Sequence, residues 1–104
     1  MAIIFTNLGA SANPDINNGA NQTAYSGTSW TPPTSGLILC FVVSYIAAIG
    51  NVPTVAGNGV AWVQIATVAV DTGTSHRVTL FGANATGSIT GIVGVNFAGQ
   101  TQLA

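Results

Sequence analysis

A run of apolar residues extends from Leu37 to Gly50 and contains no charged side chain. Its centre, LILCFVVSYI, is rich in β-branched and aromatic residues, which favour strands. Turn-forming residues bracket the run, with Ser35-Gly36 before it and Gly50-Asn51 after it. The run has about 14 residues, fewer than the roughly 20 that a membrane-spanning helix needs. We therefore predict a β-strand over residues 37–46 and no membrane segment.

Both faces of this predicted strand are apolar. Successive side chains of a strand point to opposite sides of the sheet, so one face can enter the core of the domain while the other needs a different cover. We expect a loop or a second subunit to provide that cover. The two faces consist of Leu37, Leu39, Phe41, Val43 and Tyr45, and of Ile38, Cys40, Val42 and Ile46.

Turn-forming residues divide the rest of the chain into further short strand-like runs. Asn58-Gly59 lies between VPTVAG and VAWVQIATVAV, and this dipeptide between such runs predicts a hairpin. DTGTS and NATGS separate the next runs, HRVTLFGA and ITGIVGVNFAG, which predicts a meander. The last run alternates as a half-buried strand does. Its apolar positions are Ile89, Val93, Val95 and Phe97, with Thr90, Gly94 and Asn96 opposite.

No segment shows a sustained helical periodicity with caps, so we predict an all-β fold. The runs above, together with AIIFTNL near the N-terminus and a short strand around Thr23–Tyr25, make about seven short strands. We expect residues 1–104 to form a single β-sandwich of jelly-roll or immunoglobulin-like type. Residues 10–29 are rich in Asn, Ser, Gly and Ala, and we expect them to form a long loop or arm.

Charged side chains are nearly absent from the chain. Asp15, Asp71 and Arg77 are the only ones, which is 3% of the residues where about 25% is usual. Nucleic-acid binding and polybasic membrane attachment both depend on Lys and Arg, so we expect neither. A surface of amides and hydroxyls has little charge to desolvate when it docks, and burying charge is costly. The composition favours a subunit that packs against neighbours, with a plain extracellular polar surface as the alternative.

Few residues could support catalysis. His76 is the only histidine, and Ser75 and Asp71 are near it in sequence. Ser75 and His76 are expected on opposite faces of a strand, which argues against a Ser-His-Asp site. Asp15 and Asp71 are the only carboxylate pair that a glycosidase could use, and with the single Cys40 they are too few for a dedicated metal site. We predict no enzymatic activity, no catalytic residue and no cofactor.

Three side chains are candidate contacts with a partner or ligand: Tyr25, Trp30 and Arg77. Exposed aromatic rings could stack on a sugar, although Trp in a small sandwich more often fills the core. We expect a core position for Trp62, whereas Trp30 borders a loop. Arg77 could pair with Asp71 across the DTGTS turn, or it could anchor one contact between subunits.

Three segments taken together resemble virion structural proteins of tailed bacteriophages: WTPPTSGLILCFVVS, GNGVAWVQIATV and HRVTLFGANATGSITGIVGVNFAGQT. The resemblance covers residues 30–100. It implies a β-sandwich module of an extracellular virus particle, made in the host cytoplasm, as a capsid decoration protein or a part of a tail or fibre. Similar chains continue with another strand, whereas this one stops at QTQLA. We therefore expect the N-terminal arm or a neighbour's strand to complete the sandwich.

These observations predict a non-enzymatic structural protein that forms homo-oligomers and binds a major capsid or other virion protein through uncharged faces. One alternative is a module that recognises a glycan or a cell surface through Trp30, Tyr25 and nearby amide side chains. Another is a subunit of a self-assembling extracellular filament.

Overall fold

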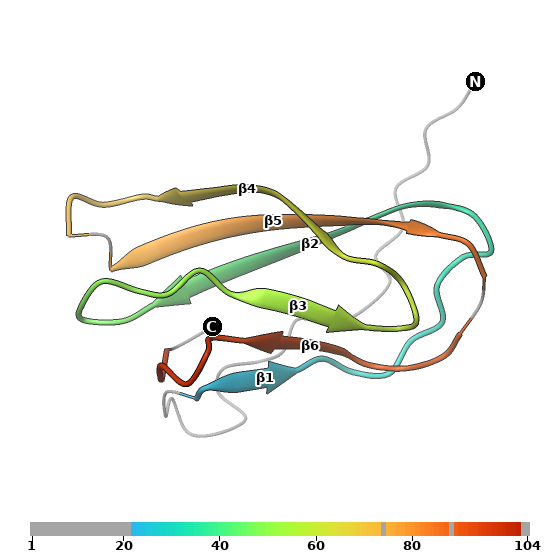
Figure 1. Ribbon diagram of the computed structural model, residues 1–104, viewed down its shortest axis with the longest axis horizontal. Helices are drawn as coiled ribbons and strands as arrows, with labels where there is room; N and C mark the ends of the chain where they lie inside the picture. The colour runs from blue at the N-terminus through green and yellow to red at the C-terminus, as the bar shows by residue number, and fades with distance from the viewer. Residues whose placement is uncertain (1–21, 74, 88, 103–104) are drawn as a thin grey trace.

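The computed structural model describes residues 22–73, 75–87 and 89–102, which form six β-strands and no helix. The strands make two three-stranded antiparallel sheets with the orders β1-β6-β3 and β2-β5-β4, packed as two layers (Figure 1). Their bounds are β1 Ala24–Ser26, β2 Gly36–Tyr45, β3 Thr54–Gly57, β4 Val63–Ala69, β5 His76–Ala85 and β6 Val93–Asn96.

The predicted all-β sandwich is confirmed at this level, with six strands in place of about seven. AIIFTNL and the first part of the expected arm, residues 10–21, lie outside the described residues. Each of the other six predicted runs overlaps one of the observed strands. None of the described residues belongs to a helix that could cross a membrane.

The turn at Asn58-Gly59 forms, but it does not make a hairpin. Both residues have positive φ, 55° and 63°, as a tight turn of this type requires. The strands on its two sides belong to different sheets, because β3 pairs with β6 and β4 pairs with β5. The predictions of a hairpin here and of a meander are therefore wrong. The chain uses this segment to pass from one sheet to the other.

The physical reason for this crossing is the pairing of β4 with β5, and Trp62 holds the connection between the sheets against the core. Its indole Nε1 donates a hydrogen bond to the carbonyl oxygen of Gly57 at 3.1 Å, and its ring packs against the hydrophobic core. A hairpin would turn β4 back along β3 and leave the β2-β5 pair without its third strand. The Asn58-Gly59 pair in the sequence cannot distinguish a β3-β4 hairpin from a crossing between the two sheets, because both use the same two turn residues.

The core lies between the two sheets. Phe97 is fully buried, and its ring meets that of Tyr25 edge to face with 6.2 Å between the centroids. Val42 and Phe81 complete the buried cluster from the other sheet. Partly buried side chains packed around this cluster include Cys40, Val55, Trp62 and Val95. Trp62 packs against this cluster, as expected. Val95 and Phe97 of the predicted alternation also face the core, whereas Ile89 lies outside β6 and is 58% exposed, so the predicted apolar face does not extend to Ile89.

Candidate functional site

The two apolar faces of β2 lie in different environments. Ile38 and Val42 point into the sandwich and are only 4% and 5% exposed, whereas Phe41 and Val43 on the other side are 64% and 63% exposed. Figure 1 shows the β1-β6-β3 sheet on one side of β2-β5-β4 and no other described strand on the opposite side. The second apolar face therefore lacks cover from the described residues, as the pattern predicts.

This exposed surface continues across the whole β2-β5-β4 sheet. The strand register places Val43 opposite Val78 and Val78 opposite Val68, so one row of valines crosses all three strands. We call the surface the outer face. It consists of Leu37, Leu39, Phe41, Val43 and Tyr45 of β2, Val78, Leu80 and Gly82 of β5, Val63, Ile65, Ala66 and Val68 of β4, and Val70 just after β4.

A shallow hollow lies on the outer face beside Gly82, a buried position without a side chain. Leu37, Val63 and Ile65 are among the residues that line it. Ile65 lies where the β4-β5 register shifts, between Gln64 and Ala66. Such a bulge inserts one extra residue and can re-aim a side chain. The side chain of Ile65 lies over Gly82, since a Cβ added there would be 2.8 Å from Ile65 Cδ1.

The outer face carries no charged side chain. Of the three charged residues in the chain, Asp15 lies outside the described residues, Asp71 lies in the β4-β5 turn, and Arg77 points to the opposite side of the sheet. His76 stands at the end of the face, with its ring 4.6 Å from that of Tyr45. Docking on this surface would therefore leave no charge buried without a partner.

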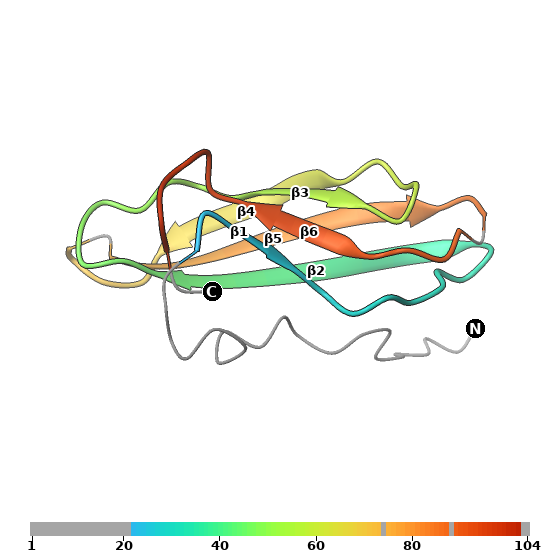
Figure 2. The same cartoon turned by 90° about the horizontal axis from the view of Figure 1, so that it is seen from below.

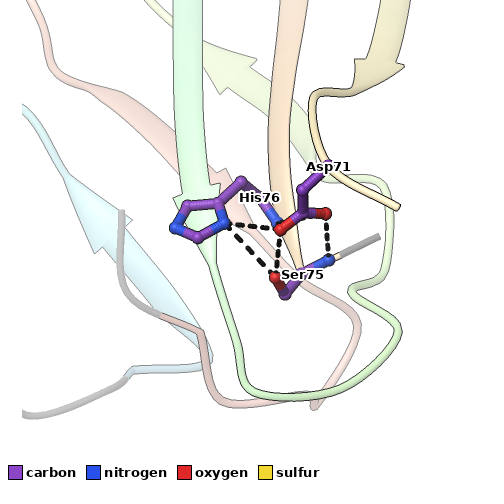
Figure 3. Close-up of polar contacts among 3 residues, drawn as sticks. All are labelled: Asp71, Ser75 and His76. Carbon is purple, nitrogen blue, oxygen red and sulfur yellow. Dashed lines mark hydrogen bonds and ion pairs between the residues drawn. The ribbon is translucent and has the colours of Figure 1, made fainter. Parts of the chain in front are cut away.

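Asp71, Ser75 and His76 come together in the turn between β4 and β5 (Figure 3). The expectation that Ser75 and His76 would point apart is wrong, because β5 begins at His76 and Ser75 precedes it. His76 Nδ1 lies 2.7 Å from Asp71 Oδ2 and 3.2 Å from Ser75 Oγ. The Ser75 hydroxyl donates directly to the Asp71 carboxylate, and the Ser75 amide donates to its other oxygen at 2.9 Å.

The connections within this cluster differ from those of a Ser-His-Asp nucleophile. In such a site the histidine uses one ring nitrogen for the serine and the other for the aspartate. Here both groups meet the same atom, Nδ1 of His76, and the serine hydroxyl is already bonded to the carboxylate. The imidazole of His76 and the hydroxyl of Ser75 hold the pKa of Asp71 well below its usual range. The arrangement is that of an aspartate closing a turn.

Arg77 is bonded within its own chain. Its two terminal nitrogens donate to Thr67 Oγ1 at 3.2 Å and to the carbonyl oxygen of Gly50 at 3.3 Å. The suggested pair with Asp71 is therefore wrong, because Asp71 lies in the turn while Arg77 faces the interior side of the sheet. The guanidinium ties β4 and the segment after β2 to β5.

The two candidate aromatic contacts do not form a platform. Tyr25 is 7% exposed, its ring is part of the core, and its hydroxyl donates to the carbonyl oxygen of Gln102 at 2.6 Å. A ring in this position has no face available for a sugar. Trp30 is half-buried, and its backbone makes a two-bond bridge with Gly91, with N···O distances of 2.9 and 3.1 Å.

Other kinds of site find little support in the described part of the chain. Its histidine, cysteine and acidic side chains form no group of three that could hold a metal ion. Cys40 is partly buried, and burial raises the pKa of its thiol, which disfavours the reactive thiolate. No protein-family model, no curated protein and no solved structure matches the chain in the comparisons made.

The outer face is therefore the candidate functional site. The sequence predicted only the part of it that lies on β2. The contribution of β4 was missed, although six of its seven residues are exposed. Val63, Ile65, Val68 and Val70 in VAWVQIATVAV could have indicated it, but the bulge breaks their alternation after Gln64.

Proposed function

We propose that the chain is a non-enzymatic structural subunit that assembles with copies of itself or with a larger shell through the outer face. The observation that carries this proposal is the continuous exposed apolar surface over three strands. Monomeric proteins rarely expose apolar patches of more than a few hundred square ångströms, and larger patches mark interaction sites.

The proposed mechanism is packing of uncharged, shape-complementary surfaces. A domain with almost no charge gains little from electrostatic steering, and its association draws on apolar burial. The edges of both sheets are also uncovered by other described strands, because β2 and β4 flank β5 and β1 and β3 flank β6. Uncovered edges favour further pairing between chains, so a filament is a related possible outcome of the same chemistry.

The biological setting that we propose is a virus particle, with the chain as a decoration or stabilising subunit. This part rests on the resemblance of residues 30–100 to tailed-phage virion proteins, and on the two-layer β architecture that jelly-roll and immunoglobulin-like structural modules share. Glycan recognition is not proposed, because Tyr25, one of its two aromatic residues, is buried in the core.

Sedimentation velocity over a range of concentrations, at low salt and at about 1 M NaCl, tests the proposal. The screening length falls to roughly 3 Å at the higher salt, so contacts between charges would weaken strongly while apolar contacts would persist. We expect the chain to associate, or to dock on purified capsids, equally well in both buffers. A chain that remains a monomer and binds no capsid, or whose binding collapses with salt, would refute the proposed function.

A further inference from the structure

We propose that the outer face is the contact between two copies of this chain, packed sheet on sheet about a two-fold axis. The inference rests on the proposed function and names the partner for this one surface. Two-fold dimers are the commonest oligomers, and each subunit contributes the same patch to such an interface. Sheets that pack face to face interdigitate the side chains of their inner faces about 10 Å apart.

The size of the outer face fits such a contact. Nine of its large side chains are between 38% and 67% exposed. If a fully exposed side chain of this kind presents about 120–200 Å², the nine together offer roughly 600–1,000 Å². The largest apolar patch of an ordinary monomer is about 300–600 Å², whereas a stable interface buries about 800 Å² on each partner. The outer face therefore has the area that a dimer needs.

The absence of charge makes the outer face compatible with its own copy. In a two-fold contact each side chain near the axis meets its own counterpart, so a charged residue there would meet a like charge. The outer face has none, and the charged residues of the described chain, Asp71 and Arg77, are engaged within the chain. A charged partner would gain no ion pair on this surface, whereas a second copy needs none.

The relief of the outer face also suits a second copy. Phe41 on β2 is 64% exposed, and its register partner on β5 is Leu80. The hollow beside Gly82 lies two positions further along β5. A projecting ring and a nearby hollow on one surface can fill each other reciprocally when two such surfaces face each other. Packing of this kind provides the complementarity that the core of an interface requires.

The test compares three charge substitutions in the full chain by sedimentation velocity. Phe41→Lys and Val68→Lys place an ammonium group on the outer face, on β2 and on β4. Ile49→Lys is the matched control, because Ile49 is 75% exposed and does not belong to the outer face. We expect the wild type and Ile49→Lys to be dimers, because neither has a lysine in the contact. Burying an unpaired lysine is costly. Phe41→Lys and Val68→Lys should weaken dimerisation by about a hundredfold or more, with circular dichroism and thermal unfolding confirming that each variant is folded.

Gly82→Ala is a milder probe of the same contact. The added methyl group would lie 2.8 Å from Ile65 Cδ1 and so shifts that side chain, which lines the hollow. The dimer should therefore weaken about tenfold, the effect of losing one close apolar contact. An unchanged dimer affinity in this variant would count against reciprocal filling of the hollow.

The remaining outcomes separate this inference from the proposed function. Oligomers that persist in both Phe41→Lys and Val68→Lys overturn the face-to-face contact but leave assembly through another surface, such as the β2 edge, standing. A monomeric wild type that docks on capsids, and loses docking in Phe41→Lys, assigns the outer face to the shell and also overturns the dimer. A monomeric wild type that Phe41→Lys destabilises would indicate cover from within the chain. If the chain shows no self-association at any concentration and docks on no capsid, both proposals fail.

Discussion

Two phenylalanines of this chain should lose very different amounts of stability on the same substitution. Phe97 is fully buried in the core, whereas Phe41 is 64% exposed on the outer face. Phe97→Ala removes a complete aromatic contact and leaves a cavity, which costs about 3–5 kcal/mol, including its edge-to-face contact with Tyr25. Phe41→Ala removes a ring that is mostly in water, so the monomer should lose only about 0–1 kcal/mol, chiefly through strand propensity.

The difference is large compared with the whole stability of such a domain. A chain of 104 residues has a free energy of unfolding of about 5–15 kcal/mol. Since each kcal/mol shifts the melting temperature of a domain of this size by about 4 °C or more, Phe97→Ala should melt at least 12 °C below the wild type. Phe97→Leu, which costs roughly 1–2 kcal/mol, is the variant to use if Phe97→Ala does not fold.

Urea unfolding measures this difference when it is carried out at several protein concentrations. Association adds to the apparent stability in a concentration-dependent way, so the lowest concentration reports the monomer. We expect Phe97→Ala to lower stability at every concentration and Phe41→Ala to lower it only where the chain associates. If Phe41→Ala lowered monomer stability as much as Phe97→Ala, the assignment of the two faces of β2 would be refuted.

Three further predictions follow from single contacts. Tyr25→Phe removes a buried hydrogen bond of 2.6 Å and should cost about 0.5–1.5 kcal/mol in urea unfolding; no loss would mean that the hydroxyl is hydrated. Gly57→Ala should destabilise far more than Gly99→Ala, although both have positive φ, because only at Gly57 would a Cβ lie 2.1 Å from a backbone oxygen; equal melting temperatures would contradict this. Asp71→Asn should lower the melting temperature at pH 7, and the difference from wild type should shrink as the pH falls below 3.8, because the imidazole of His76 and the adjacent hydroxyl depress the pKa of Asp71 in the folded state. A difference that is constant with pH would show that the carboxylate charge is not involved.

The sequence predicted the secondary structure of the described residues well, because alternation is a local property. β2 was predicted over residues 37–46 and observed as Gly36–Tyr45, since its β-branched and aromatic content and its flanking turns agree. Alternation also reported which residues share a face, and it identified Phe97 as a core position. The same argument failed for β4, where a bulge shifts the alternation by one residue.

The candidate site was predicted only in part. The β2 half of the outer face follows from the sequence, because both sides of that strand are apolar. The burial of Tyr25 and the partners of Arg77 do not follow, because each depends on residues that are remote in sequence, such as Gln102 for Tyr25 and Gly50 for Arg77. The cluster of Asp71, Ser75 and His76 was not predicted because of an error of one residue in a strand boundary. Ser75 was assigned to a strand that begins one residue later.

By itself, then, the sequence determined an all-β chain, a strand with two apolar faces and a surface almost without charge. These properties depend on residue type and on a period of two, both of which are visible locally. Only the tertiary structure decided which strands share a sheet, that the Asn58-Gly59 turn joins two sheets, and that β4 extends the outer face. Those decisions depend on competition between long-range pairings for the core. Figure 2 shows the outcome, with the β1-β6-β3 sheet lying across the β2-β5-β4 sheet. The order of residues along the chain does not show the result of that competition.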